Sequence, residues 1–438
     1  MADFDTLRIR AGYDSADNNY SVNVPIYQTA AFDLGSIDRA QSLWAMDELA
    51  PIYTRVANPT VATLEARLAA LDNAHGALAL ASGMTAISYT IIALTEGGGN
   101  IVAPHSLYGG SEDALTNFYP KFGANIKFVE DRFDINSYEK EIDEKTRGIY
   151  VESISNPNAE LYDIEALAEL AHRHNIPLIV DNTVATPYLF NPFEHGADII
   201  VYSLTKAISG HGNTIAGAVL ESGKFKYKEE LFPQFYKKSH KIRNRAGESR
   251  SAYDIDPDGA FLIYLRAFYL EFIGAALSPF NAYLVIQGID TLSERVAKQT
   301  RNAEKLVKYL STKDEVKWVK YPTAEGSQFE VLAKKYFKKG SGYLFTFGFG
   351  GTEEELGAFL GHLKYFSYHV NIGDVRSLIV NSPRTTHAEL DAERLEKAGI
   401  DSNTVRISAG LENADDLIED LEEAFDFVFG EKKEEKAV

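Results

Sequence analysis

The chain has 438 residues, of which 45% are hydrophobic and 24% charged, a composition ordinary for a folded enzyme with a large core. Lysine and arginine number 44 against 63 acidic residues, and the net charge of −19 argues against broad binding to nucleic acid or to an anionic membrane. No cysteine is present, which excludes disulfides, thiolate metal sites and a cysteine nucleophile.

The first 60 residues lack regular periodicity and contain three prolines, Pro25, Pro51 and Pro59. Such a segment predicts an extended arm, over residues 1–60, that lies on another surface such as a neighbouring subunit. The chain starts with acidic residues and no apolar core segment, so no signal or transit peptide is indicated and we expect a cytoplasmic protein. Polar residues interrupt the most membrane-like stretch, 77–94, which fits a buried strand, loop and helix better than a membrane span.

Short apolar runs alternate with helix-like segments from Thr60 onward, where Leu64, Leu68 and Leu71 share one face of the first helix. Strands that alternate with helices favour a parallel sheet covered on both faces. The pattern therefore predicts an α/β fold whose large domain holds a mostly parallel seven-stranded sheet. The strand-like runs are 77–81, 101–103, 126–129, 149–151, 178–180, 199–202 and 216–220.

The second half of the chain changes character twice. Residues 222–258 are locally basic and aromatic, and they predict a solvated loop or lid. An apolar helical region from 261 to about 289 then predicts a crossing to a second domain, which contains the strand-like run 343–347 and a closing helix near 415–429. The expected division is an arm over 1–60, a large domain over 61–280 and a smaller C-terminal α/β domain over 281–438.

A lysine and a carboxylate each follow one of the apolar runs. Lys206 comes after the run 199–202, and Asp181 directly follows the run 176–180. Parallel strands end at the same edge of a sheet, so a crossover between these two would bring both side chains to the crevice where open α/β folds bind ligands. A buried amine can form an imine with an aldehyde cofactor, and a carboxylate can keep a pyridine nitrogen protonated; pyridoxal phosphate catalysis needs both. The alternatives are a solvated lysine and an aspartate that caps a turn.

Two further segments at predicted strand ends could contact such a cofactor. Ser82, Gly83 and Met84 open a helix, where backbone N–H groups and the helix dipole attract a phosphate, although Ser and Gly also start helices for capping reasons alone. Tyr108 precedes two glycines and could stack on a flat ring while its hydroxyl assists proton transfer. The alternative for Tyr108 is a core aromatic in a glycine turn.

Polar residues elsewhere complete the candidate set. Asn156, before a proline, offers an amide for the cofactor's phenolic oxygen or makes an ordinary turn. Tyr53 and Arg55 point the same way if the arm is extended there, so two donors could meet one phosphate. Arg406 lies within an apolar strand pattern and predicts either a site for a substrate carboxylate or a structural ion pair. No histidine spacing typical of a metal site occurs, and the glycines fit a nicotinamide-binding fold poorly.

Together these motifs resemble the Cys/Met-metabolism family of fold type I pyridoxal-phosphate enzymes over nearly the whole chain. Within it the chain is most similar to the O-acetylhomoserine sulfhydrylases, through its length and the segment Leu277–Ala282 that leads to Gln287-Gly288. The motifs that carry the likeness are Tyr53-x-Arg55-x-x-Asn58-Pro59-Thr60, Ser82-Gly83-Met84, Tyr108-Gly109-Gly110, Ser155-Asn156-Pro157, Asp181-Asn182-Thr183, Ser203-x-Thr205-Lys206 and Arg406-x-Ser408-x-Gly410-x-Glu412.

The resemblance implies a role for each matching residue. Lys206 would bind the cofactor aldehyde and shuttle protons with Tyr108, which stacks on the ring. Arg406 and the backbone near Ser377 would hold the substrate carboxylate. Tyr53 and Arg55 would arrive from the adjacent subunit of a homotetramer built as a dimer of dimers. The remaining cofactor contacts implied are Asp181 on the ring nitrogen, Asn156 on the ring oxygen, Thr183 beside Asp181, and Ser82, Gly83, Met84, Ser203 and Thr205 around the phosphate.

The resemblance also implies a reaction: γ-replacement on O-acetyl-L-homoserine with sulfide, or a thiol such as methanethiol, giving homocysteine or methionine and acetate. The alternatives are γ-elimination or cystathionine synthesis on the same scaffold, and a binding protein that keeps the fold without catalysis. Methionine γ-lyases tend to carry a cysteine where Gly110 stands, which disfavours the lyase alternative. Arg384 departs from the family pattern, and we expect it to lie near the rim of the site and to influence which acyl group is accepted. Small-molecule substrates are the expected partners, without nucleic acid, membrane or metal.

Overall fold

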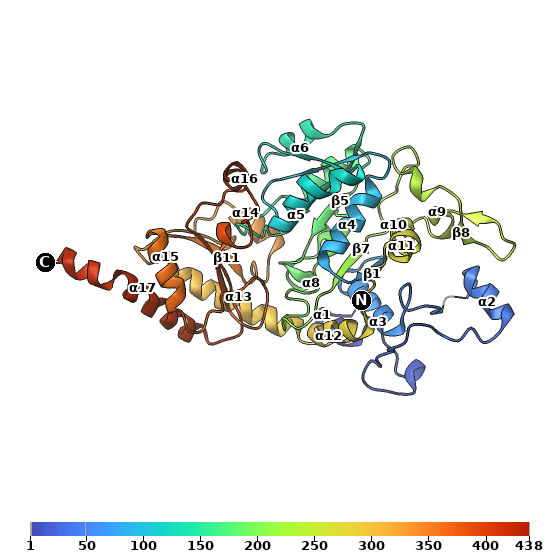
Figure 1. Ribbon diagram of the computed structural model, residues 1–438, viewed down its shortest axis with the longest axis horizontal. Helices are drawn as coiled ribbons and strands as arrows, with labels where there is room; N and C mark the ends of the chain where they lie inside the picture. The colour runs from blue at the N-terminus through green and yellow to red at the C-terminus, as the bar shows by residue number, and fades with distance from the viewer. Residues whose placement is uncertain (1, 49, 438) are drawn as a thin grey trace.

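The central element of the computed structural model, which describes residues 2–48 and 50–437, is a seven-stranded sheet (Figure 1). Its strand order is β1-β7-β6-β5-β4-β2-β3. Strands β2 to β6 pair in parallel, whereas β7 is antiparallel to both β1 and β6. The predicted mostly parallel sheet is confirmed. Its strands are β1 Gly76–Leu80, β2 Asn100–Ala103, β3 Asn125–Phe128, β4 Thr146–Glu152, β5 Leu178–Asp181, β6 Ile199–Tyr202 and β7 Gly217–Glu221.

Helices cover both faces of this sheet, which explains why its strands read as continuous apolar runs. Along β6, Ile200 and Tyr202 pack into the core on one face, while Ile199 and Val201 pack into the core on the other. The first core includes side chains of α3 Pro59–Asp72, α7 Ile164–Arg173 and α12 Pro279–Ile289; the second includes those of α4 Gly83–Leu94 and α10 Ala260–Tyr264. Shorter helices of this part are α5 Gly109–Asp113, α6 Ile135–Glu141, α8 Thr186–Leu189 and α9 Ala252–Ile255.

A second, four-stranded antiparallel sheet with order β10-β11-β13-β12 lies toward the C-terminal end of the chain. A third core forms where this sheet packs against α13, α15 and α17. The expected strand near 343–347 and the closing helix are both present, whereas the domain boundaries at 60 and 280 stay predictions. The elements are β10 Val316–Lys320, β11 Leu344–Phe349, β12 Leu378–Asn381, β13 Thr404–Ser408, α13 Leu292–Leu310, α14 Glu330–Tyr336, α15 Glu353–His362, α16 Ala392–Lys397 and α17 Ala414–Ala437.

The N-terminal segment is anchored at its start and projects from the body further along. Helix α1 Phe4–Arg10 packs beside α3, where the Arg67 side chain donates hydrogen bonds to the carbonyls of Ile9 and Ala11. The part around α2 Ile37–Trp44 lies away from both sheets (Figure 1). Large apolar side chains are exposed there, with Ile37 79% and Trp44 48% accessible.

Two expectations for the middle of the chain need correction. The predicted solvated loop at 222–258 is in part a core segment, because Tyr227, Phe232 and Phe235 are buried in the core that includes α4. Only its later part projects, as the hairpin of β8 Ser239–Arg243 and β9 Ser249–Arg250.

The helical region predicted at 261–289 is interrupted. A π-helical turn, Leu265–Leu270, follows α10, and α11 Glu271–Ile273 ends at Gly274. Gly274 has φ +89°, and Ala276 then pairs with Leu80 of β1 as an isolated bridge. The chain becomes extended here to meet the sheet edge, and Ser278 caps the new helix α12. Within residues 2–48 and 50–437, no helix combines the length and hydropathy needed to cross a bilayer.

Candidate active site

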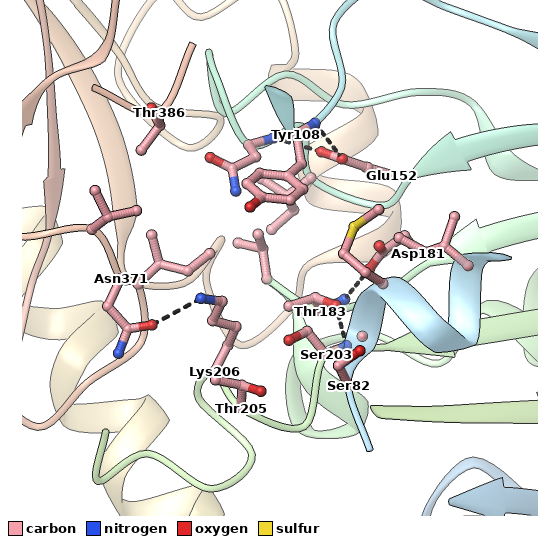
Figure 2. A pocket seen from close by; sticks show the side chains of 18 of the residues that line it. Ser82, Tyr108, Glu152, Asp181, Thr183, Ser203, Thr205, Lys206, Asn371 and Thr386 are labelled. Carbon is pink, nitrogen blue, oxygen red and sulfur yellow. Dashed lines mark hydrogen bonds between the residues drawn. The ribbon is translucent and has the colours of Figure 1, made fainter. Parts of the chain in front are cut away.

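A cavity lies at the carboxyl ends of β4, β5 and β6, and residues of the second sheet and its loops complete its lining (Figure 2). This is the edge of the sheet at which the sequence predicted a ligand. Loop residues 370–372 and Arg406 of β13 approach from the second sheet. The predicted residues that the structure brings together here are Ser82, Gly83, Met84, Tyr108, Asn156, Asp181, Thr183, Ser203, Thr205, Lys206 and Arg406.

Lys206 enters the cavity from the turn that follows β6. Its Nζ donates a hydrogen bond of 2.9 Å to Oδ1 of Asn371, which lies in a loop of the second sheet (Figure 2). Burial lowers the pKa of Lys206 to about 8, and the nearby Arg406 guanidinium acts in the same direction. The amine is therefore neutral far more often at physiological pH than an exposed lysine, as a nucleophile toward an aldehyde requires.

Asp181 ends β5 with its carboxylate held in a fixed orientation. One oxygen, Oδ1, accepts the N–H of Thr183 at 3.0 Å, and Oδ2 accepts the hydroxyl of Tyr150 at 3.2 Å. Thr183 in turn fixes the neighbouring strand end, because its hydroxyl accepts the N–H of Ser203. Burial raises the pKa of Asp181. A cationic ligand atom beside the carboxylate would act against this shift and favour the ionised form.

The start of α4 forms a close-fitting cradle beside β6. The Ser82 side chain caps the helix by accepting the N–H of Thr85 at 3.1 Å. A Cβ atom on Gly83 would lie 2.6 Å from Cβ of Ser203, and one on Gly217 would lie 2.1 Å from the carbonyl oxygen of Ser82. Only glycine fits at both positions. The helix start thus packs against the ends of β6 and β7, with backbone N–H groups and the Ser203 hydroxyl available to an anion.

Arg406 is the charged group that β13 of the second sheet contributes to the cavity. It is 3% exposed, and its hydrogen bonds go to Asn156 Oδ1 at 2.5 Å and to the Asn371 carbonyl at 3.4 Å. Among the residues that the structure describes, no aspartate or glutamate forms an ion pair with Arg406. Burial lowers the pKa of its guanidinium to about 10. A buried guanidinium without an anionic partner favours the substrate-carboxylate interpretation over a structural ion pair.

Glu152 is a cavity residue that the sequence interpretation missed. It ends β4 directly beside Asp181 in the sheet register and is 4% exposed. Its two oxygens accept the N–H groups of Tyr108 at 2.6 Å and Asn156 at 2.7 Å (Figure 2). The signal was present, because Glu152 follows the apolar run 149–151 just as Asp181 follows its own run.

Two more missed residues come from the C-terminal part of the chain. Asn371 contacts Lys206 directly, and Thr386 lines the cavity on the side of Tyr108. The Thr386 hydroxyl lies 2.9 Å from Nδ1 of His387, and burial lowers the pKa of that histidine to about 3, which leaves its ring neutral. Neither Asn371 nor Thr386 follows a strand of the seven-stranded sheet, so no pattern in the sequence marked them.

The other predicted residues lie outside this cavity. Tyr53 and Arg55 are on the exposed arm, with the guanidinium 5.2 Å from the centre of the tyrosine ring. Ser377 donates both its N–H and its hydroxyl to Glu412, at 2.8 Å each, and does not reach the lining, so its predicted substrate contact finds no support in the geometry. Arg384 pairs with Glu353 at the start of α15 and is absent from the described lining of the cavity, so its influence on acyl specificity stays a prediction without a supporting contact.

The donors in the cavity fit pyridoxal phosphate. The ring nitrogen needs a fixed carboxylate, the aldehyde needs a buried amine, and the phosphate needs N–H and hydroxyl donors that its oxygens can approach closely. Asp181, Lys206 and the Gly83 cradle meet these needs in that order, and the Tyr108 ring offers a stacking surface. This fold and site define a pyridoxal-phosphate enzyme of fold type I.

The chain belongs to the Cys/Met metabolism family of PLP-dependent enzymes, whose model matches residues 5–426. It is 38% identical over 430 residues to a sulfhydrylase of Fusarium oxysporum, with 98% of each chain covered. It is 37% identical to the O-acetyl-L-homoserine sulfhydrylase of Leptospira meyeri, with 96% of each covered. An O-acetylhomoserine (thiol)-lyase structure from Campylobacter jejuni, which holds N′-pyridoxyl-lysine-5′-monophosphate, superimposes with a TM-score of 0.91 at 36% identity, covering 97% of this chain and 100% of that one.

Replacement of Glu152 by glutamine tests the role of this carboxylate in the site. An amide oxygen can accept only one of the two N–H groups, and the amide nitrogen would face the other, so the Tyr108 and Asn156 segments lose a common anchor. We expect Glu152→Gln to weaken pyridoxal phosphate binding by about tenfold, the equivalent of one unsatisfied buried group. Absorbance titration of the apoprotein measures this.

Glu169 provides a matched control, because it is exposed on α7 away from the cavity. Glu169→Gln is expected to leave the affinity unchanged. A Glu152→Gln protein that binds the cofactor as tightly as the unmodified chain would show that the two N–H contacts do not shape the site.

Proposed function

We propose that this protein catalyses γ-replacement on O-acetyl-L-homoserine with sulfide, giving L-homocysteine and acetate. The observation that carries the proposal is that Lys206, Asp181 and Arg406 line one cavity, in which Arg406 has no carboxylate partner among the described residues. Relatedness to sulfhydrylases over nearly the whole length of the chain supports it. A thiol such as methanethiol would give methionine by the same route. In the reaction the bond from the γ carbon to oxygen breaks, acetate leaves with the electron pair, and sulfide supplies the pair of the new bond from carbon to sulfur.

The substrate is bound and oriented by groups at opposite ends of the cavity. Arg406 takes the substrate carboxylate in its planar fork, and its contact with Asn156 fixes the guanidinium from behind. The side chains of Ile215, Val370 and Ile372 give this lining an apolar part. Tyr108 lies across the cavity from Lys206 (Figure 2), where its ring would stack on the cofactor.

We assign the proton transfers to Lys206, and to Asp181 the task of keeping the ring nitrogen of the cofactor protonated. Pyridoxal phosphate, when bound, supplies an aldehyde that combines with the substrate amine and a ring that withdraws electrons from the bonds at the α carbon. Lys206 Nζ removes the α proton, and Asn371 Oδ1 keeps the amine directed into the cavity. Asp181 holds the proton on the ring nitrogen, with Thr183 and Tyr150 fixing its oxygens.

We further assign Tyr53 and Arg55 to the cofactor phosphate of a neighbouring subunit in a homotetramer built from dimers. Their exposure, and their position outside the cavity of their own chain, support this assignment. We place the enzyme in the cytoplasm, since its proposed substrates are small metabolites.

A product assay distinguishes γ-replacement from the other reactions of this scaffold. The purified enzyme, loaded with pyridoxal phosphate, is given O-acetyl-L-homoserine with sulfide, methanethiol or cysteine in separate reactions. We expect homocysteine and acetate in equal amounts with sulfide. Ammonia and 2-oxobutanoate formed without any thiol would instead identify γ-elimination, and cystathionine as the preferred product would identify a cystathionine synthase. O-succinyl-L-homoserine tests the acyl group in parallel.

The lowered pKa of Lys206 predicts how cofactor uptake depends on pH. Only the neutral amine reacts with an aldehyde, and its fraction rises roughly tenfold per pH unit until the pH reaches the pKa. Because the pKa of Lys206 is lowered from 10.5 to about 8, we expect the rate of uptake by apoprotein to rise up to about pH 8 and then level off. Rapid mixing with absorbance detection measures the rate. With N-acetyl-lysine in place of the protein the rise is expected to continue toward pH 10, and the same profile in both would contradict the shift.

A further inference from the structure

A buried arginine outside the cavity lining holds the turn that carries Lys206; we name residues 203–210 the Lys206 turn. Arg295 of α13 is 5% exposed, and its guanidinium donates to the carbonyls of Ala207 at 2.8 Å and Ile208 at 3.1 Å. Within the described chain no backbone N–H bonds to either carbonyl, although both residues are buried. Arg295 therefore supplies the hydrogen bonds that the backbone of this turn lacks.

Glycines on two sides allow the guanidinium and its helix to approach the Lys206 turn closely. Gly210 has φ +76°, and a Cβ atom there would lie 1.9 Å from Nη1 of Arg295. A Cβ atom on Gly288, near the end of α12, would lie 2.3 Å from the carbonyl oxygen of Ser209. Arg295 also donates to the Gly288 carbonyl at 2.6 Å and to the Thr291 hydroxyl at 3.1 Å. One side chain thus joins the α12–α13 junction to the turn.

The same helix holds a second loop of the cavity through Gln299. We name residues 371–375, which include the partner of Lys206, the Asn371 loop. Gln299 lies one helical turn beyond Arg295, on the same face of α13, and is fully buried. Its amide Nε2 donates to the carbonyl of Asp374 at 2.7 Å. Two neighbouring side chains of α13 therefore bind the backbones of two different loops.

The Lys206 turn and the Asn371 loop meet each other at the cavity. Lys206 Nζ donates to Asn371 Oδ1 at 2.9 Å, and the Val375 N–H donates to the Gly210 carbonyl at 2.9 Å. The turn follows the seven-stranded sheet, whereas the loop precedes β12 of the second sheet. Helix α13 contacts α8 in one part of the molecule and β10, β11 and α17 in the other, and it extends from the region of α12 to that of α17 (Figure 1). The position of α13 thus determines how the two loops face each other.

We propose that Arg295 and Gln299 are positioning residues through which α13 holds the Lys206 turn and the Asn371 loop in register, so that the amine of Lys206 is directed at the reacting carbon. The inference rests on the proposed function for the task of that amine. A purely structural role would be to cap the junction between α12 and α13. The hydrogen bonds to Gly288 and Thr291 serve that junction, whereas those to Ala207 and Ile208 reach the Lys206 turn.

Lysine in place of Arg295 tests the proposal without changing the charge. A single ammonium cannot reproduce the planar fork that spans these carbonyls, so the Lys206 turn loses part of its support. We expect Arg295→Lys to lower kcat by about 100-fold, the effect of a misplacement of about 1 Å. The KM for O-acetyl-L-homoserine is expected to change less than about threefold, since no hydrogen bond of the described chain joins Arg295 to β13, which carries Arg406. Arg301→Lys, at an exposed position of the same helix, is the matched control and is expected to change neither constant.

Trace acetylation of the apoprotein reports on Lys206 without cofactor or substrate. Acetic anhydride reacts with the neutral amine only, and peptide mapping across a pH series gives the pH at which Lys206 is half reactive. We expect this midpoint near pH 8 in the unmodified protein, and about one pH unit higher in Arg295→Lys, where the amine is less buried. The substitution keeps the net charge and leaves the other titratable groups around Lys206 unchanged, so the shift measures position. These groups are Tyr108, Glu152, Asp181 and Arg406 of the lining and Asp374 of the Asn371 loop.

The outcomes separate positioning from a structural cap. A folded Arg295→Lys protein that unfolds at a lower temperature, but keeps its acetylation midpoint and kcat, would overturn the proposal. If the lysine variant does not fold, Gln299→Met decides, because methionine fills a similar volume without the donor to Asp374. We expect Gln299→Met to raise the midpoint and to lower kcat by about tenfold, the equivalent of one lost buried hydrogen bond. An unchanged midpoint and kcat in this variant would equally reject the proposal.

The acetylation readout also separates this inference from the proposed function. An unmodified protein that forms no homocysteine would reject the proposed reaction, while the comparison of midpoints between Arg295→Lys, Arg301→Lys and the unmodified chain would stand. Equal midpoints in all three, with homocysteine formed at equal rates, would reject the positioning role and leave the reaction in place.

Discussion

Replacement of Lys206 by alanine is expected to lower turnover by about 100- to 10,000-fold, the range that a positioned proton-transfer group contributes. The Nζ of Lys206 is the only amine in the described lining of the cavity, and its hydrogen bond with Asn371 directs it inward. Alanine removes both the group that reacts with the cofactor aldehyde and the base at the α carbon. Steady-state release of homocysteine measures turnover, and borohydride reduction with peptide mapping measures the label on residue 206.

Arginine is the matched variant for this position. Lys206→Arg keeps a cation near Asn371, but a guanidinium cannot give up its proton in this pH range. If the role of Lys206 is chemical, Arg and Ala variants are expected to be equally inactive and equally unlabelled. An Arg variant with near-normal turnover would mean that only the positive charge matters, and the assignment of Lys206 as base would fail. Addition of a small primary amine is expected to restore part of the activity of the Ala variant, where space is left, and none of the Arg variant.

The seven strands could be predicted because each is buried on both faces. Such strands need no alternation, and a short apolar run between helical segments is a sufficient signal. The position of the site followed from the same rule, since Asp181 and Lys206 both come after runs that became parallel neighbours, β5 and β6. Topology therefore placed two catalytic candidates together without any knowledge of their contacts.

The contributions of the second sheet could not be predicted in this way. Asn371 and Thr386 lie in loops whose approach to the cavity depends on how the two sheets pack, and no local periodicity records that packing. Only Arg406 stood out, because a charge inside an apolar strand pattern is unusual on its own. Glu152 differs from these, since its position at the end of β4 carried the same signal as Asp181.

The segment 222–258 shows how composition misleads when charge and burial occur in the same stretch. Its many lysines and arginines predicted a solvated loop, yet Phe232 and Phe235 pack against α10 and its neighbours in the core. The cations lie on both sides of these aromatic residues, in the stretch 224–228 before them and in 237–250 after them. The average over the whole segment therefore hid the buried aromatic residues between them, whereas the aromatic spacing read separately would have indicated burial.

Replacement of Asp181 by asparagine is expected to lower turnover by about 100- to 1,000-fold while leaving the fold unchanged. The amide has nearly the same shape, and its oxygen can still accept the N–H of Thr183, while its nitrogen can donate to the Tyr150 hydroxyl. What is lost is the negative charge. Without that charge the ring nitrogen of the cofactor is held less well in its protonated form, and the α carbon loses less electron density to the ring.

Glutamate provides the comparison that separates charge from shape. Asp181→Glu restores the carboxylate but lengthens the side chain by one methylene, so we expect it to recover part of the activity that asparagine loses. The surface variant Asp416→Asn on α17 controls for a general effect of removing one charge. Turnover and the affinity for O-acetyl-L-homoserine are measured separately, because loss of charge control lowers kcat, whereas a distorted site also raises KM. An asparagine variant with kcat within a few-fold of the unmodified enzyme would show that Asp181 does not govern the electron-withdrawing ring.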